Sequence, residues 1–209
     1  MKDEWSMAYR RPSIVRLSPI WVLIVVNIII FILTTIDSEL INVLALNAIN
    51  VFHFPWTMVT SMFVHLGPWH LIFNMWTLYF FGTYLSRLVG WGRFFIVYFC
   101  GGILGGVFYI LMASPFTWVA GASGAIFALG GAMAVMRPNI KVIVFPIPAP
   151  IPLWIAVIGG FVILTLLSNS MNIAWQAHMG GLVFGLIMGY FFRRRERSSS
   201  YYSVYRVRY

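Results

Sequence analysis

Long, uninterrupted runs of apolar residues constrain this chain more than any other feature of its sequence. A bilayer core is about 30 Å thick, so a helix that spans it needs roughly 17–25 apolar residues. Hydrophobic residues make up 61% of the 209 residues and charged residues only 9%, a balance foreign to soluble domains. The sequence therefore predicts an all-α membrane protein with six transmembrane helices, near 19–36, 68–88, 94–112, 121–136, 153–168 and 175–192.

The fourth run, 121–136, is shorter than a lipid-exposed helix needs to be. Backbone polar groups at membrane depth must be satisfied within protein. We therefore expect this helix to lie at the centre of the bundle, surrounded by other helices.

The positions of the basic residues predict on which side of the membrane each connection lies. The fourteen Lys and Arg precede the first run, lie at the second and fourth connections, or follow the sixth run, and connections 37–67, 113–120 and 169–174 contain none. Basic loops remain cytoplasmic, so both termini are predicted to be cytoplasmic and the protein to be a multi-pass protein of the cell membrane. The expected organisation is a cytoplasmic segment 1–17, a six-helix domain 18–192 with a long outer loop 37–67, and a basic cytoplasmic tail 193–209.

The excess of basic residues also bears on partners. Clusters placed between apolar runs favour membrane topology over nucleic-acid binding, and we expect no nucleic acid partner. The cluster 193–197 is interpreted as a topology anchor, with recognition of anionic membrane lipids as the alternative.

Acidic residues are absent from all six runs, since the five in the chain are Asp3, Glu4, Asp37, Glu39 and Glu196. An aspartyl intramembrane protease needs paired carboxylates, and a zinc metalloprotease needs a His-Glu-x-x-His helix, so both classes are excluded. The single cysteine, Cys100, cannot form a disulfide or a cysteine-based metal site within one chain. We expect no metal and no other cofactor.

A few polar residues remain at the outer ends of the runs, where they carry most of the functional information. Ser123 opens the fourth run and His178 lies near the start of the sixth. A serine hydroxyl becomes a nucleophile when a neighbouring base takes its proton, and histidine suits that exchange near neutral pH. The sequence therefore predicts Ser123 as nucleophile and His178 as general base.

Small residues would let these two helices approach. The sixth run has glycine every fourth residue, and the fourth run has a matching small-residue face. The faces consist of Gly181, Gly185 and Gly189 on one side and Gly124, Ala128 and Gly131 on the other. With no carboxylate to orient the histidine, we expect packing by Phe127, one turn below Ser123, to do so.

Hydrolysis of a peptide bond also needs donors for the oxyanion, each worth about 3–4 kcal/mol in known cases. His70 and Asn74 stand four residues apart, on one helical face. We assign them this role together with the backbone N–H of Ser123, which lies in the first turn of its helix. His65 is interpreted as a loop residue that hydrogen-bonds the outer connection.

Three motifs combine these residues: Gly121-Ala122-Ser123-Gly124, His65 with His70 and Asn74, and Ala177-His178-Met179-Gly180-Gly181. In order, spacing and helix number, from about residue 15 to 192, the chain resembles the rhomboid proteases. The resemblance implies a six-helix core, a Ser123–His178 dyad, an oxyanion site at His70 and Asn74, and cleavage of single-pass membrane proteins near the outer face.

The chain departs from the family pattern at two positions. Trp56-Thr57 stands where the family often has Trp-Arg, and Phe127 where many members have tyrosine. The alternative function is a non-catalytic rhomboid-like protein that binds transmembrane segments, although such proteins typically lack the serine or the histidine. A small-solute transporter is disfavoured because we find no internal repeat and no charge at the membrane midplane.

Overall fold

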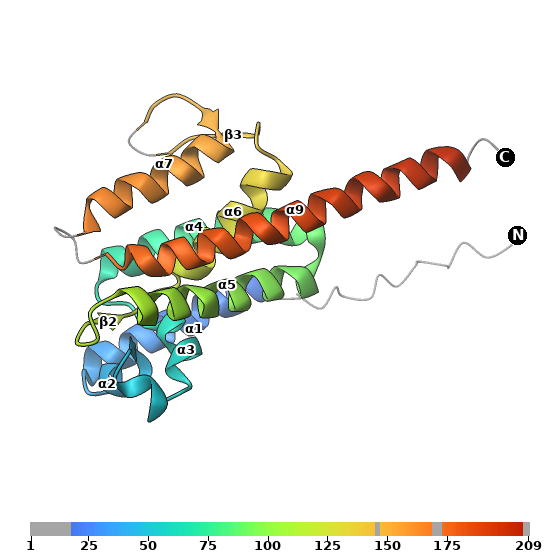
Figure 1. Ribbon diagram of the computed structural model, residues 1–209. Helices are drawn as coiled ribbons and strands as arrows, with labels where there is room; N and C mark the ends of the chain where they lie inside the picture. Colours follow the sequence, from blue (N-terminus) through green and yellow to red (C-terminus); the bar gives the residue numbers. More distant parts are fainter. Residues whose placement is uncertain (1–17, 145–146, 169–172, 207–209) are drawn as a thin grey trace, which may run out of the picture.

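The structure, a computed structural model, describes residues 18–144, 147–168 and 173–206 (Figure 1). The predicted segment 1–17 and residues 169–172 of the last outer connection lie outside the described residues. Six helices follow the predicted runs: α1 (Pro19–Ile36), α4 (Pro68–Val89), α5 (Trp91–Met112), α6 (Ser123–Met136), α7 (Leu153–Leu166) and α9 (Trp175–Arg206).

Two helices among the described residues, α1 and α5, are long and apolar enough to cross a membrane by length and composition. Helices α6 and α7 are apolar but shorter, at 14 residues each. The predominantly helical fold is confirmed, while the number of spans and the side on which the termini lie stay predictions.

The helix ends follow from local sequence. Ser18 caps α1, because its Oγ accepts a hydrogen bond from the Ile20 N–H at 3.4 Å and Pro19 occupies the first turn. Between α4 and α5 the chain turns at Gly90, whose φ of 81° lies in the left-handed region that favours glycine. Because a single residue makes this turn, the two helices are neighbours along the chain and in space.

Helix α6 is the centre of the molecule, as the sequence predicts. Eleven of its 14 residues are buried, and it packs against α4, α5, α7 and α9. It starts at Ser123, so the predicted start at Gly121 is wrong by two residues. Gly121 has a φ of 122°, which no α-helix accommodates, and Ala122 is the N-cap.

Helix α9 is longer than predicted, since it continues to Arg206 instead of ending near residue 192. Residues 193–206 of the predicted tail are therefore a continuation of the helix. Hydropathy falls at Arg193 because the apolar surroundings end there, but arginine and glutamate favour the helical backbone as well as leucine does. Figure 1 shows α9, in red, extending well past the ends of α5 and α6.

The long loop 37–67, called the outer loop after its predicted side, is a series of short elements: α2 (Leu40–Leu44), β1 (Leu46–Asn47), η1 (Asn50–Phe52), α3 (Thr57–Thr60) and η2 (Ser61–Phe63). β1 pairs in antiparallel fashion with β2 (Trp118–Val119), just before the turn that opens α6. The Asn47 side chain reinforces this pairing, because its Nδ2 donates to the Thr117 carbonyl at 3.0 Å. The outer loop is thus attached to the segment that leads into Ser123.

A second two-stranded pairing, β3 (Lys141–Val142) with β4 (Ile151–Pro152), links α6 to α7. The strand pairing agrees with an alternating proline pattern that disfavours helix in this connection.

Candidate active site

The two small-residue faces predicted from the sequence meet. A Cβ added at Gly181 would overlap the Gly124 carbonyl oxygen, and one at Gly185 would overlap the Ala128 carbonyl. At Gly189 the added Cβ would lie 2.5 Å from the Ala132 carbonyl oxygen. Helix α9 therefore lies against the backbone of α6 along three successive turns, closer than any side chain allows.

A neighbouring face of α9 approaches α5 in the same way. A Cβ at Gly180 would lie 2.6 Å from the Leu104 carbonyl oxygen, and one at Gly105 would lie 2.6 Å from the Ala177 carbonyl oxygen. Enclosed between α5 and α6, α9 holds its outer end in a fixed position, and His178 with it.

This packing brings Ser123 and His178 together. Ser123 is the first residue of α6 and partly exposed, whereas His178 is only 4% exposed. The Ser123 Oγ lies 2.8 Å from the His178 Nε2. With the ring proton on Nδ1, Nε2 accepts the hydroxyl proton, which is the geometry that activates a serine.

The Phe127 ring packs against the imidazole of His178. Its centroid lies 4.7 Å from that of the His178 imidazole, with the planes inclined by 32°. The buried His178 Nδ1 has no hydrogen-bond partner among the residues that the structure describes. Among the described residues, His178 therefore contacts the Phe127 ring, and no carboxylate pairs with its Nδ1 as in a Ser-His-Asp triad.

His70 faces the turn before Ser123. A Cβ at Gly121 would lie 2.7 Å from the His70 Nε2 and 3.8 Å from the Ser123 Oγ, so the imidazole lies directly against this glycine. The buried Asn74 Nδ2 donates to the His70 carbonyl at 2.7 Å, one turn back along α4. That bond uses one of the two amide protons and orients the side chain, and the other proton remains available.

His65 supports His70 from the outer loop. It is 2% exposed, its ring meets that of His70 edge-on at 4.9 Å, and its Nδ1 lies 3.4 Å from the Phe63 carbonyl oxygen. Burial, and secondarily the charge of His70, lowers the pKa of His65 to about 3. His65 is therefore neutral at physiological pH and contributes shape rather than charge.

The structure adds residues that the sequence did not identify. The Gly121 N–H donates to the Ser61 carbonyl at 2.9 Å, which attaches the outer loop to the turn before the serine. Beside Ser123 is a small cavity whose wall includes Met62 of the loop, Gly102 and Gly106 of α5, and Ala177 of α9. The only sequence signal for this cavity is the close spacing of the glycines in α5, two of which, Gly102 and Gly106, line it. Ser61 and Met62 follow no motif.

Comparisons with known proteins add independent findings. The family model described as "Rhomboid domain" matches residues 53–195. "Rhomboid protein 1, mitochondrial" of Saccharomyces cerevisiae is 29% identical over 150 residues, which cover 65% of this chain and 41% of that protein. "Rhomboid protease GluP" of Bacillus subtilis is 37% identical over 131 residues, covering 62% of this chain and 24% of that protein.

A third similar protein is named as inactive. "Inactive RHOMBOID-like protein 8" of Arabidopsis thaliana is 35% identical over 81 residues, covering 39% of this chain and 23% of that protein. The chain thus matches less than half the length of each of these three relatives. Similarity alone therefore leaves open whether this chain is active. The answer depends on which site residues it has.

Proposed function

This chain belongs to the rhomboid family of integral membrane proteins, and from that membership we propose that it is an intramembrane serine endopeptidase acting on single-pass transmembrane proteins near the outer membrane face. The observation that carries the proposal is the 2.8 Å between the Ser123 Oγ and the His178 Nε2. One relative is named as a rhomboid protease, which supports the same reaction class.

The reaction proceeds in two halves. His178 takes the hydroxyl proton as the Ser123 Oγ attacks the scissile carbonyl, and the same proton then passes to the leaving amine as the C–N bond breaks. A water molecule, deprotonated by His178, attacks the resulting ester, and the second product leaves as a carboxylic acid while Ser123 regains its proton. The chemistry requires neither a metal nor a nucleotide.

Charge develops on the substrate carbonyl oxygen in both halves. We assign its stabilisation to the backbone N–H of Ser123, the free amide proton of Asn74 and the imidazole of His70. The Ser123 N–H has no partner within α6 because it belongs to the first helical residue. His70 lies against Gly121, and a larger residue there would separate its Nε2 from the serine. Gly121, Gly124, Gly181, Phe127 and His65 act as supporting residues.

Substrate preference follows from the cavity beside Ser123. Its walls at Gly102, Gly106 and Ala177 are lined by backbone and a single methyl group, and the cavity is small. A small side chain on the residue whose carbonyl is attacked would fit there. We therefore propose that substrates carry a small residue at the scissile bond.

The proposed topology is that of a multi-pass protein with six spans and both termini in the cytoplasm. The proposed organisation is a cytoplasmic segment 1–17, a six-helix domain 18–192 and basic cytoplasmic residues from 193 onwards. We propose the cell membrane as the location, although one relative is named as mitochondrial. The proposed partners are transmembrane substrates and membrane lipids.

A non-catalytic binder of transmembrane segments is the second candidate, because one relative is named as inactive. Retention of both Ser123 and His178 favours catalysis. Purified protein in liposomes with a single-pass reporter separates the two. The wild type should cleave, Ser123→Ala and His178→Ala should not, and Asn74→Ala should be slower by about 10²–10³-fold, as for removal of an oxyanion donor. Cleavage that survives Ser123→Ala would exclude the proposed mechanism.

A further inference from the structure

The contact between α6 and α9 repeats itself. Both helices run from the outer end towards the cytoplasmic end, and Gly181, Gly185 and Gly189 meet the backbone of residues 124, 128 and 132 in turn. Ala177 continues the series at the outer end of α9. Each position in this series is thus a small residue, four residues from the next, while Leu182 and Leu186 of α9 lie beside it against Gly131.

The four-residue spacing of such a repeat does not by itself specify one axial position. If α9 shifted by one turn, Ala177, Gly181 and Gly185 would face residues 124, 128 and 132. The Ala177 Cβ would then press on the Gly124 carbonyl that Gly181 now meets, and Gln176 would replace Gly180 against Leu104, so close packing already disfavours the shift. The shift would move His178 by about 5.4 Å relative to Ser123, which is far outside hydrogen-bond reach. Directed contacts particular to one register would add to this steric preference for the active arrangement.

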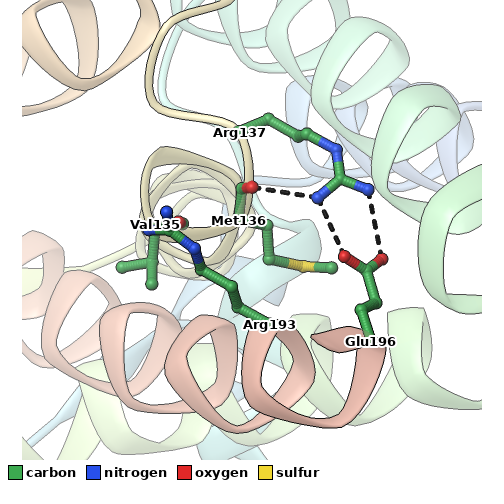
Figure 2. Close-up of polar contacts among 5 residues, drawn as sticks. All are labelled: Val135, Met136, Arg137, Arg193 and Glu196. Atoms are coloured by element: carbon green, nitrogen blue, oxygen red, sulfur yellow. Dashed lines mark hydrogen bonds and ion pairs between the residues drawn. The ribbon is translucent and has the colours of Figure 1, made fainter. Parts of the chain in front are cut away.

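Contacts of this kind occur at the cytoplasmic end of the same two helices (Figure 2). The Arg193 Nη1 donates to the Val135 carbonyl at 3.0 Å, one helical turn beyond Gly189. Arg137 and Glu196 form a two-pronged ion pair, with Nη1 to Oε2 at 2.9 Å and Nη2 to Oε1 at 3.2 Å. We call these four contacting groups, Arg193, the Val135 carbonyl, Arg137 and Glu196, the cytoplasmic clasp.

The clasp also completes the end of α6. The last carbonyls of a helix have no partner within it, and a cation is favoured near them. Arg193 satisfies Val135, and the Arg137 Nη1 satisfies Met136 at 2.9 Å. Because Arg137 bonds both Met136 and Glu196, it connects the end of α6 to one specific turn of α9 (Figure 2).

We propose that Arg193, Arg137 and Glu196 are positioning residues that set the axial register of α9 against α6 and thereby hold His178 in reach of Ser123. The inference rests on the proposed function and extends it to residues at the opposite end of the bundle. The side chains of the ion pair are 35% and 37% exposed, so their contribution to overall stability is small. Their effect is selective: a one-turn shift would break every bond of the clasp and the stacking of Phe127 on His178.

A charge exchange tests the proposal. The full chain in liposomes is reacted with a fluorophosphonate probe, and the rate constant and final extent of Ser123 labelling are measured separately. Arg137→Glu and Glu196→Arg should each lower the rate constant about fivefold, less than the hundredfold that a 1 Å misplacement can cost. The double variant Arg137→Glu/Glu196→Arg should recover to within about twofold, as expected for a direct pair. Arg194→Gln, at an exposed neighbour of Arg193, is the matched control.

The outcomes separate positioning from simple stability. A loss in the final extent of labelling, with the rate constant unchanged, would mean that the pair only stabilises the fold, and the proposal would be wrong. Equal rate constants in all variants, or no recovery in the double variant, would also overturn it.

A second measurement does not depend on catalysis. In a Cys100→Ser background, the substitutions Ser123→Cys and His178→Cys introduce two thiols, which are bridged by a short bifunctional thiol reagent. Adding Arg137→Glu or Arg193→Gln should lower the bridged fraction, and adding Arg194→Gln should not. If the wild type fails to react with the fluorophosphonate, the proposed function fails, and the bridging result alone decides whether the clasp sets the register.

Discussion

The two ends of the α6–α9 contact hold the helices together by different kinds of interaction. At the end that the proposed topology makes the outer one, glycines allow backbone to meet backbone, and the polar groups that face each other are the hydroxyl of Ser123 and the imidazole of His178. At the other end, which the proposed topology makes the cytoplasmic one, Arg193, Arg137 and Glu196 reach across with long charged side chains. The glycine end depends on the absence of side chains, and the end with the arginines and Glu196 depends on long side chains.

The difference reflects the surroundings. Within the apolar part of the bundle a charge would be costly, and close backbone packing is the available source of attraction. Where α9 leaves that part, at Arg193, ions are tolerated, and geometry can be specified by directed bonds. Close packing therefore brings the helices together and disfavours added Cβ atoms, whereas the directed bonds are the proposed further selection of one register.

Filling the space between the helix backbones at the outer end should have the largest effect on stability. Gly181→Ala introduces a Cβ that overlaps the Gly124 carbonyl, and we expect a loss of about 3 kcal/mol in stability. Thermal unfolding in detergent measures this change. Gly160→Ala in α7 is the matched control, since a Cβ there meets nothing within 4 Å, and it should leave stability unchanged or slightly raised. Equal effects of the two substitutions would show that the close contact is not limiting.

Loss of the stacking at the outer end should reduce catalysis more than stability. Phe127→Ala frees the His178 ring, and we expect kcat to fall about 10–100-fold with little change in KM. Phe127→Tyr retains the stacking ring and should remain close to wild type. Steady-state cleavage of a transmembrane reporter measures both constants, and a normal kcat for Phe127→Ala would assign the orientation of His178 to its enclosure alone.

At the cytoplasmic end, removal of one directed bond should have a moderate effect. Arg193→Gln withdraws the cation from the Val135 carbonyl and should cost about 1 kcal/mol, the usual contribution of one hydrogen bond. Arg194→Gln should stay within about 0.5 kcal/mol, as surface substitutions do. A shift in unfolding temperature that is the same for both variants would mean that the net charge, and not the bond, is responsible.

Salt should produce the smallest effect and at the cytoplasmic end only. Raising the ionic strength from about 0.1 to 1 M shortens the Debye length from about 10 to 3 Å, so the partly exposed Arg137–Glu196 pair should weaken by at most about 0.5 kcal/mol. Thermal unfolding of wild type and Glu196→Gln in sodium chloride measures this, and the variant should respond less. The outer end, which holds no ion pair among the described residues, gives no reason for a salt response.

The sequence predicted the helical runs and the motif residues because hydropathy and four-residue spacing are local properties. Membership of the rhomboid family, first suggested by three motifs, is confirmed by the family comparison. The same local view explains the errors. Hydropathy measures the surroundings, so it ended the last helix at residue 192, although the backbone stays helical to Arg206.

Features formed by distant residues could not be predicted. Glu196 finds Arg137 across 59 residues, and neither belongs to a recognisable motif. The pairing of β1 with β2 and the bond from the Gly121 N–H to Ser61 join the outer loop to the catalytic turn through backbone atoms, which carry no sequence signature. Gly121 itself was assigned to a helix because glycine in an apolar run does not reveal its φ.

The backbone at Gly121 has a consequence for how this protein can evolve. Its positive φ disfavours any side chain, and its nearest neighbour, the His70 ring, leaves no volume for even a methyl group. Every nucleotide change in a glycine codon that alters the amino acid adds at least a Cβ, so no neutral single step leads away from this position. We expect lineages that lose Gly121 to lose proteolysis with it, and to be free afterwards to drift at Ser123 and His178.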